Sequence, residues 1–172
     1  MTRRGLHAIV VHPSGILGPY DYGLSHLTQF VTAYYSGALR VGVNGHYNFV
    51  DVRDVAAGCL LAAEKGRIGQ CYILSNQVYS VRELLDFLQN NGAARVNLLF
   101  PLWAAKLIAP LAEFYSRKRQ RPTLVTQYSI HTLGSNANFS HQKASRELGY
   151  QPRSIQATLS DMTDWLKESG RI

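Results

Sequence analysis

The stretch Ala8-Ile9-Val10-Val11-His12-Pro13-Ser14-Gly15-Ile16-Leu17-Gly18-Pro19-Tyr20 decides the fold of this chain. Its first four residues form a short apolar run that stops at Pro13-Ser14-Gly15, where proline and glycine favour a turn. Such a run predicts a buried parallel strand, from about His7 to Val11. Because open α/β sheets bind ligands at the carboxyl ends of their strands, the turn is a candidate ligand site.

Helical and extended segments alternate along the rest of the chain, which predicts an α/β protein. Helices are expected at about 25–36, from Asp51 or Asp54 to Glu64, and at 80–89, 101–115, 140–148 and 155–168. Further extended pieces are expected at 40–43, 47–50, 71–74 and 95–98. Asn44-Gly45 predicts a hairpin turn between the first two of these pieces, and Ser80 with Glu83 predicts a capping box.

Five motifs, taken in order, resemble the extended short-chain dehydrogenases/reductases. They are Pro13 to Pro19, Asn48-Phe49-Val50-Asp51-Val52-Arg53-Asp54-Val55-Ala56, Cys71 to Ser75, Ser80 to Leu84, and Lys143 to Arg153 followed by Trp165-Leu166. Each motif is weak alone, and their common order carries the resemblance. The apolar segment 98–115, Arg121-Pro122 and Asn138-Phe139-Ser140 resemble the flavonol-reductase and 3β-hydroxysteroid dehydrogenase branch more than the nucleotide-sugar epimerases.

The resemblance implies a partial Rossmann-type sheet edge, made of the last parallel strands, and a mostly helical substrate-binding cap. The edge would comprise about 1–17 and 51–92, and the cap about 18–50 and 93–172. In the family, residues matching Pro13, Ser14 and Gly15 face the nicotinamide of NAD or NADP. The alternative is a strand-ending turn that binds nothing.

The resemblance also implies a role for four residues nearer the cap. Ser25 lies where some members contact the nicotinamide or the substrate. Tyr20, Tyr22 and Phe49 are candidates to line the substrate pocket. Each of these three aromatic residues could equally be part of the cap core.

Two features of the complete enzymes are absent from this sequence. A dinucleotide fingerprint needs glycines in a strand-to-helix turn and an acidic residue about twenty positions later. Gly15 and Gly18 imitate two of the glycines, but Asp21 stands at the third position and Arg40 where the acid is expected. No lysine follows a tyrosine by four positions, so the family's proton-donating Tyr-x-x-x-Lys pair is missing too. We therefore expect a C-terminal half that does not catalyse alone.

Composition narrows the classes of protein and the kinds of site that fit this sequence. The 172 residues, 46% of them hydrophobic, suit a globular α/β protein. Two cysteines are too few for a disulfide framework, which favours a reducing, cytoplasmic location.

The net charge of +7 concentrates at Arg117-Lys118-Arg119-Gln120-Arg121, and this run is expected to be a solvated loop, not a nucleic-acid site. Pro101, Lys106, Pro110 and Glu113 oppose a transmembrane helix in the apolar segment, and the six histidines lack metal-ligand spacing.

Three functional hypotheses stay open. The first is the substrate-binding part of an NAD(P)-dependent oxidoreductase or epimerase, in which hydride passes between the nicotinamide and a carbinol or ketone carbon of a small, apolar substrate. The second is a non-enzymatic binding module derived from this family. The third is a membrane-surface protein that uses 98–121 as an interfacial helix with a basic flank. Exposed sheet edges could also let the chain self-associate.

Overall fold

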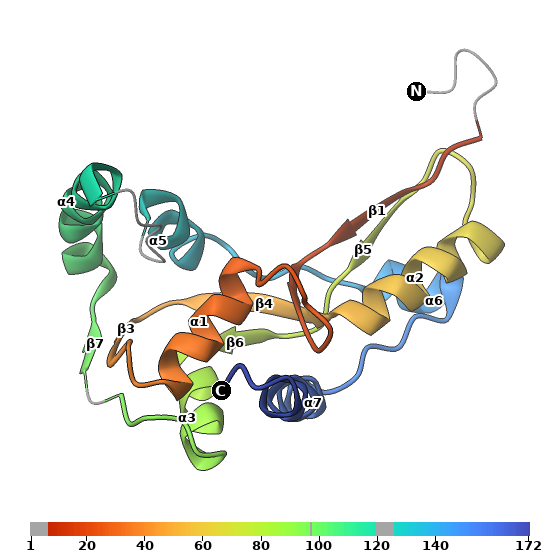
Figure 1. Cartoon of the computed structure of the whole chain (residues 1–172). Helices are drawn as coiled ribbons and strands as arrows, with labels where there is room; N and C mark the ends of the chain where they lie inside the picture. The colour runs from red at the N-terminus through yellow and green to blue at the C-terminus, as the bar shows by residue number, and fades with distance from the viewer. Residues whose placement is uncertain (1–6, 97, 120–125) are drawn as a thin grey trace. The chain divides into compact units, whose positions relative to one another are not determined.

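The structure is a computed structural model that describes residues 7–96, 98–119 and 126–172 (Figure 1). Its strands are β1 (Val10–Pro13), β2 (Gly15–Leu17), β3 (Val41–Val43), β4 (His46–Asp51), β5 (Cys71–Leu74), β6 (Val78–Ser80) and β7 (Leu98–Phe100). Its helices are α1 (His26–Tyr35), α2 (Val52–Lys65), α3 (Val81–Asn90), α4 (Leu102–Arg119), α5 (Gln127–Leu133), α6 (Gln142–Leu148) and α7 (Ile155–Glu168). Parallel strand pairs among alternating helices confirm the predicted α/β class.

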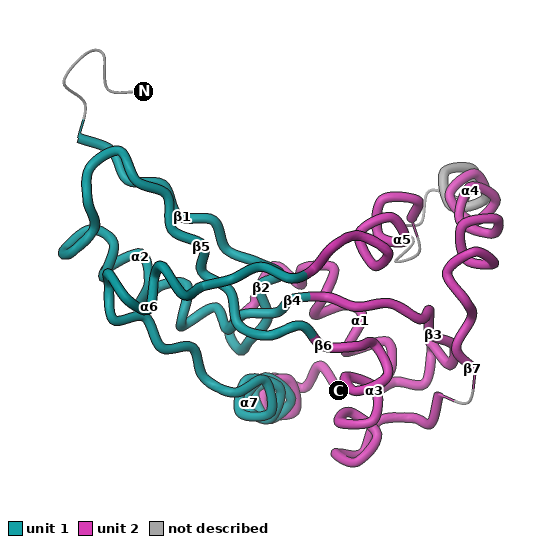
Figure 2. The backbone as a smooth tube through the Cα atoms, turned by 180° about the vertical axis from the view of Figure 1, so that it is seen from behind, with its two compact units in different colours: residues 1–20, 48–78, 138–165 teal, residues 21–47, 79–137, 166–172 magenta. Residues whose placement is uncertain are grey.

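The chain divides into two units (Figure 2). Unit 1 comprises residues 1–20, 48–78 and 138–165, and unit 2 comprises residues 21–47, 79–137 and 166–172. The bounds of these units differ from the expected division, since 18–20, 48–50 and 138–165 join the unit that holds β1 and 79–92 joins the other unit. The physical reason is packing, since α6 contacts α2 and β5 whereas α3 contacts α1. That one unit forms the cofactor edge and the other the substrate cap stays a prediction.

Unit 1 is built on two parallel strand pairs. β1 pairs with β5 from Val10↔Cys71 to Pro13↔Leu74, and β2 pairs with β4 from Gly15↔Phe49 to Leu17↔Asp51. The chain passes from the first pair to the second at Ser14. Behind β5 lies a core shared by β4, α2, α6 and the residues after α6: Val50, Ala62, Tyr72, Leu74, Ala144, Leu148 and Tyr150.

Helix α2 begins where the sequence predicts and lies close to β5. The Asp51 carboxylate caps it by accepting the main-chain N–H of Arg53 at 2.8 Å. Gly58 faces the fully buried Leu74, and a Cβ at position 58 would lie 2.7 Å from Leu74 Cδ1. Glycine therefore allows the helix to approach the strand.

The first strand differs from its prediction by about three residues. The structure begins β1 at Val10, not His7, and extends it to Pro13, and β2 occupies part of the segment expected to be a loop. Pairing with β5 sets both limits, because it runs from Val10, opposite Cys71, to Pro13, opposite Leu74. Proline is tolerated there because β1 lies at an edge of the described sheet, where a missing N–H costs least.

Unit 2 packs α1 against α3. Tyr34 of α1 is buried with Val81 and Leu85 of α3, and the Tyr34 hydroxyl donates to the Val41 carbonyl at 2.6 Å. The predicted capping box at the start of α3 is confirmed, since Ser80 and Glu83 cap each other's main-chain N–H groups. All four predicted core positions of this helix, Val81, Leu84, Leu85 and Leu88, are buried.

The predicted hairpin at Asn44-Gly45 is wrong. β3 pairs in parallel with β7, from Val41↔Leu98 to Val43↔Phe100, and Asn44 N–H donates to the Phe100 carbonyl at 2.9 Å. Gly45 accepts the Val81 N–H at 3.0 Å. A Cβ at position 45 would lie 2.8 Å from that of Leu133. Close packing of distant segments, not a tight turn, therefore explains this glycine.

The apolar helix of unit 2 is longer than predicted. α4 extends to Arg119, so residues 117–119 of the basic run belong to a helix and not to the expected loop. Gln120, Arg121 and Pro122 lie outside the described residues. No helix is predicted from the sequence at α5. This helix has only seven residues, and its capping partners are Thr126 and Ser129 instead of an acidic residue.

Candidate functional site

The candidate site in unit 1 is the turn Pro13-Ser14-Gly15, which lies at the carboxyl ends of β1 and β5 (Figure 1). Ser14 N–H donates to the Leu74 carbonyl at 3.1 Å, which holds the turn against the last residue of β5. Gly15 then pairs with Phe49 of β4. The turn is therefore fixed by main-chain bonds to both neighbouring strands.

Hydrogen bonds of side chains join the adjacent segments to the same edge. Asn76 N–H donates to Asn48 Oδ1 at 3.2 Å, and Asn76 Nδ2 donates to the Arg153 carbonyl at 2.7 Å. Ser75 Oγ donates to the Phe139 carbonyl at 3.0 Å. Asn48 immediately precedes Phe49, and Asn76 follows β5 by two residues. The edge is thus a polar layer above the core of unit 1.

Two polar atoms of this layer lack partners. Ser14 Oγ and Asn48 Nδ2 are buried, and no hydrogen bond to any described residue reaches them. Asn48 is 2% exposed, so its amide has little access to water. A buried polar group without a partner costs about 1–3 kcal/mol, and its presence calls for an explanation. A ligand that accepts hydrogen bonds at this edge would supply one.

The structure distributes the predicted substrate residues over both units. Phe49 is 4% exposed and lies in the interior of unit 1. Tyr20, also in unit 1, is 62% exposed, and its ring contacts Trp165 edge-on at 6.2 Å between centroids. Its φ of 69° is unusual for a residue with a side chain and costs about 1–2 kcal/mol. Such strained positions often occur at functional sites.

Ser25 and Tyr22 belong to unit 2. Tyr22 is 71% exposed. Ser25 is the N-cap residue of α1, and its N–H donates to Asp21 Oδ2 at 2.7 Å. The Thr28 hydroxyl donates to the same oxygen at 2.6 Å. Partial burial opposes ionisation of Asp21, but these hydrogen bonds prevail and lower its pKa.

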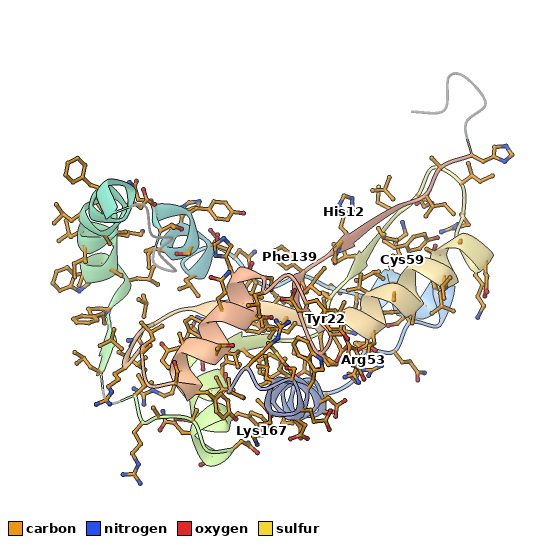
Figure 3. All side chains as sticks on the ribbon, viewed as in Figure 1. His12, Tyr22, Arg53, Cys59, Phe139 and Lys167 are labelled. Atoms are coloured by element: carbon orange, nitrogen blue, oxygen red, sulfur yellow. The ribbon has the colours of Figure 1, made fainter. Side chains whose placement is uncertain are left out.

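Charged groups of unit 1 meet at the start of α2, near Arg53 (Figure 3). Asp51 is 1% exposed, and its carboxylate accepts hydrogen bonds from Arg53 Nε at 2.9 Å and Nη2 at 2.7 Å. Burial would raise the pKa of Asp51, but the hydrogen bonds from Arg53 outweigh it and hold that pKa below its usual range. Asp54 accepts both the main-chain N–H and the Nε of Arg153, at 2.8 and 2.9 Å. The cluster ties α2 to the segment before α7 and has a structural role.

Several relatives resemble this chain over nearly all its residues. It is 31% identical to sterol demethylase protein B of Methylococcus capsulatus, over 98% of this chain and 52% of that protein. It is 26% identical to short-chain dehydrogenase/reductase family 42E member 1 of Xenopus laevis, over 96% of this chain and 46% of that protein. Over nearly all of its residues, the chain is similar to short-chain dehydrogenases/reductases, and it covers about half the length of each of these relatives.

Solved structures share the fold of this chain. The chain matches a nucleoside-diphosphate-sugar epimerase from Pseudomonas aeruginosa with a TM-score of 0.79 and 23% identity, over 99% of this chain and 51% of that one. A dTDP-glucose 4,6-dehydratase from Streptomyces venezuelae, solved with NAD, gives 0.69 and 22%, over 96% and 45%. The chain thus spans about half the length of its relatives, which is consistent with the C-terminal half of an extended dehydrogenase/reductase. No protein-family model matches the sequence.

Gly15 and Gly18 do not occupy the strand-to-helix turn of a dehydrogenase fingerprint. Gly15 lies within β2, Gly18 follows that strand, and α1 begins only at His26. Gly18 has a φ of 143°, and a Cβ there would lie 2.9 Å from Val52 Cγ1. The second glycine therefore allows β2 to pass close to the start of α2.

The described residues also bear on metal sites, membrane-spanning helices and cysteines. Among them, no three His, Cys, Asp or Glu side chains are placed to hold a metal ion. None of the helices in the described ranges is long and apolar enough to cross a bilayer. Cys59 and Cys71 are both free and exposed.

Sequence reasoning missed the supporting residues Asn48, Ser75 and Asn76. Two of them follow directly after the strand at 71–74, a position that could have marked them as edge residues. Asn48 gave no such signal, because it lies at the beginning of a motif whose obvious features are its apolar and acidic residues.

Proposed function

We propose that this chain supplies the C-terminal part of an NAD(P)-dependent oxidoreductase or epimerase that acts on a carbinol or ketone carbon. The observation that carries the proposal is the pair of unpartnered buried groups, Ser14 Oγ and Asn48 Nδ2, at the carboxyl edge of parallel strands. This edge is where α/β folds bind nucleotides. When bound, the nicotinamide would donate or accept the hydride.

The residues present fit the nicotinamide end of such a cofactor. Its carboxamide carries an oxygen that accepts hydrogen bonds, and the Ser14 hydroxyl and the Asn48 amide can donate them. Pro13 and Gly15 would then form the wall beside the ring, held in place by the bond from Ser14 N–H to Leu74. For Ser25, the N-cap residue of α1, a contact with the nicotinamide or the substrate stays a prediction from the family resemblance.

An apolar alcohol or ketone is the proposed substrate class. The exposed Tyr20 of unit 1 would line its pocket. For Tyr22 of unit 2 and for the buried Phe49, a pocket-lining role stays a prediction from the family resemblance. The name of the Methylococcus relative, sterol demethylase protein B, supports a substrate of this kind. A strained backbone at Tyr20 further supports a role for its ring in binding.

Ser14→Ala should weaken the binding of reduced nicotinamide mononucleotide about threefold to tenfold, the value of one hydrogen bond. It should not lower the free energy of unfolding and should raise it by up to about 1–3 kcal/mol, because the substitution removes a buried hydroxyl that has no partner. Titration followed by NMR measures the affinity, and urea denaturation measures the stability.

Ser75→Ala is the matched control at the same edge. Ser75 is fully buried, and its Oγ bonds to the Phe139 carbonyl, so the substitution should lower the free energy of unfolding by about 1 kcal/mol. We expect affinity for the nucleotide to change less than in Ser14→Ala. A large loss of stability in Ser14→Ala with unchanged affinity would assign the serine a structural role and contradict the proposal.

A further inference from the structure

Helix α4 of unit 2 presents a stripe of large apolar side chains to solvent. Its members follow helical spacing, so they share one face. They are Trp103, Leu107, Leu111 and Phe114, exposed by 68%, 67%, 71% and 70% respectively. Soluble proteins seldom expose so continuous an apolar surface unless it binds a partner or a membrane.

The opposite face of α4 is already occupied within unit 2. Ala105 and Ala109 are buried against Ile130 of α5. Glu113 accepts the Gln127 main-chain N–H at 2.6 Å, which fixes the start of α5 beside α4. The stripe therefore lies on the face of α4 that does not pack against α5.

The charges along this segment have almost a single sign. Between Leu98 and Arg121 the sequence has one acidic residue, Glu113, and it is engaged with Gln127. The same stretch has five basic residues: Lys106, Arg117, Lys118, Arg119 and Arg121. Three of these, Arg117, Lys118 and Arg119, follow the apolar stripe directly, at the C-terminal end of the helix, and are called the basic cluster. An apolar stripe that ends in a basic cluster complements an anionic lipid surface.

We infer that α4 binds the surface of an anionic lipid bilayer, with the stripe among the lipid chains and the basic cluster at the headgroups. Both contributions are needed, since either alone gives only weak attachment. Lipid binding by α4 is independent of the cofactor site in unit 1.

Co-sedimentation with vesicles tests this inference on the full chain. We expect binding to phosphatidylcholine vesicles that contain phosphatidylserine, and at least about tenfold weaker binding to phosphatidylcholine alone or in high salt. Trp103 reports insertion directly, because Trp165 is only 7% exposed. Brominated lipids should therefore quench Trp103 fluorescence in the bound state.

Substitutions show whether vesicle binding needs the stripe itself or only exposed apolar side chains anywhere on the chain. Leu107→Ser with Leu111→Ser should reduce vesicle binding about tenfold or more. Leu60→Ser, in α2 of unit 1 and 66% exposed, is the control and should bind like the original chain. Thermal melts show whether each variant is folded.

Three results would overturn the inference. The first is a folded chain that ignores both kinds of vesicle. The second is equal binding by the stripe variant and the Leu60→Ser control. The third is a dimer, seen by light scattering, that Leu107→Ser with Leu111→Ser dissociates while vesicle binding is absent, since a second copy would then cover the stripe.

Discussion

Asp51→Ala should lower the free energy of unfolding by about 3 kcal/mol, measured by urea denaturation. Asp51 is 1% exposed and accepts hydrogen bonds from the main chain, Nε and Nη2 of Arg53. Alanine removes the cap of α2, which alone is worth about 1 kcal/mol, and takes the buried partner from Arg53. The loss falls at the lower end for broken buried ion pairs because the Arg53 side chain is 30% exposed and keeps Asp161.

Asp161→Ala is the matched control, because it removes the other carboxylate bound to the same arginine. Arg53 Nη1 lies 2.7 Å from Asp161, whose side chain is 48% exposed. Exposed ion pairs contribute about 0–1 kcal/mol, so this variant should lose far less stability than Asp51→Ala. Equal losses would show that burial of Asp51 has no special importance.

The same carboxylate should make the stability of the chain depend on acid pH. The pKa of Asp51 is lowered in the folded state, so its stabilising effect is complete above the unfolded pKa of about 3.9. The effect is lost as pH falls through the lower, folded pKa. Below about pH 4 the original chain should therefore lose stability more steeply than Asp51→Ala.

Leu74→Ala should destabilise the chain by about 3–5 kcal/mol. Leu74 is fully buried between β1, its strand partner, and Gly58 of α2. Removing its side chain leaves a cavity in the core of unit 1, and neighbours can fill it only in part. Urea denaturation measures the loss.

Gly58→Ala shows whether the contact with Leu74 controls the approach of the helix. In the original chain the new Cβ would meet Leu74 Cδ1 and Cδ2 at 2.7 and 2.8 Å, and crowding should cost about 1–3 kcal/mol. In the Leu74→Ala background the crowding disappears, and the helical preference for alanine should stabilise by up to about 1 kcal/mol. Additive effects of the two substitutions would contradict this packing.

The sequence predicted those elements whose signals are local. Cys71–Leu74 is a strand at the predicted residues, Asp51, one of the two expected caps, begins α2, and the capping box at Ser80 starts α3. The pairing of β3 with β7 could not be read in this way. Asn44-Gly45 carries a strong local turn signal, and contacts with Phe100, Val81 and Leu133 override it. Contacts between distant segments leave no local pattern in one sequence.

The candidate site was predictable in place but not in detail. A turn at Pro13-Ser14-Gly15 after an apolar run gives its position at a strand end. The hydrogen bond from Asn76 to Asn48 joins the segment after β5 to β4, and Ser14 Oγ lacks a partner because of how the surrounding segments bury it. Neither property follows from residue type or spacing.

NMR titration of the labelled chain tests the central claim most directly. Reduced nicotinamide mononucleotide carries the nicotinamide, whereas ADP-ribose carries the pyrophosphate and adenosine without it. The nicotinamide role of the turn predicts that the mononucleotide shifts the amide signals of Ser14 and Gly15 and that ADP-ribose leaves them unchanged. Shifts at Gly15 and Gly18 with ADP-ribose, or no shift at Ser14 and Gly15 with the mononucleotide, would contradict it.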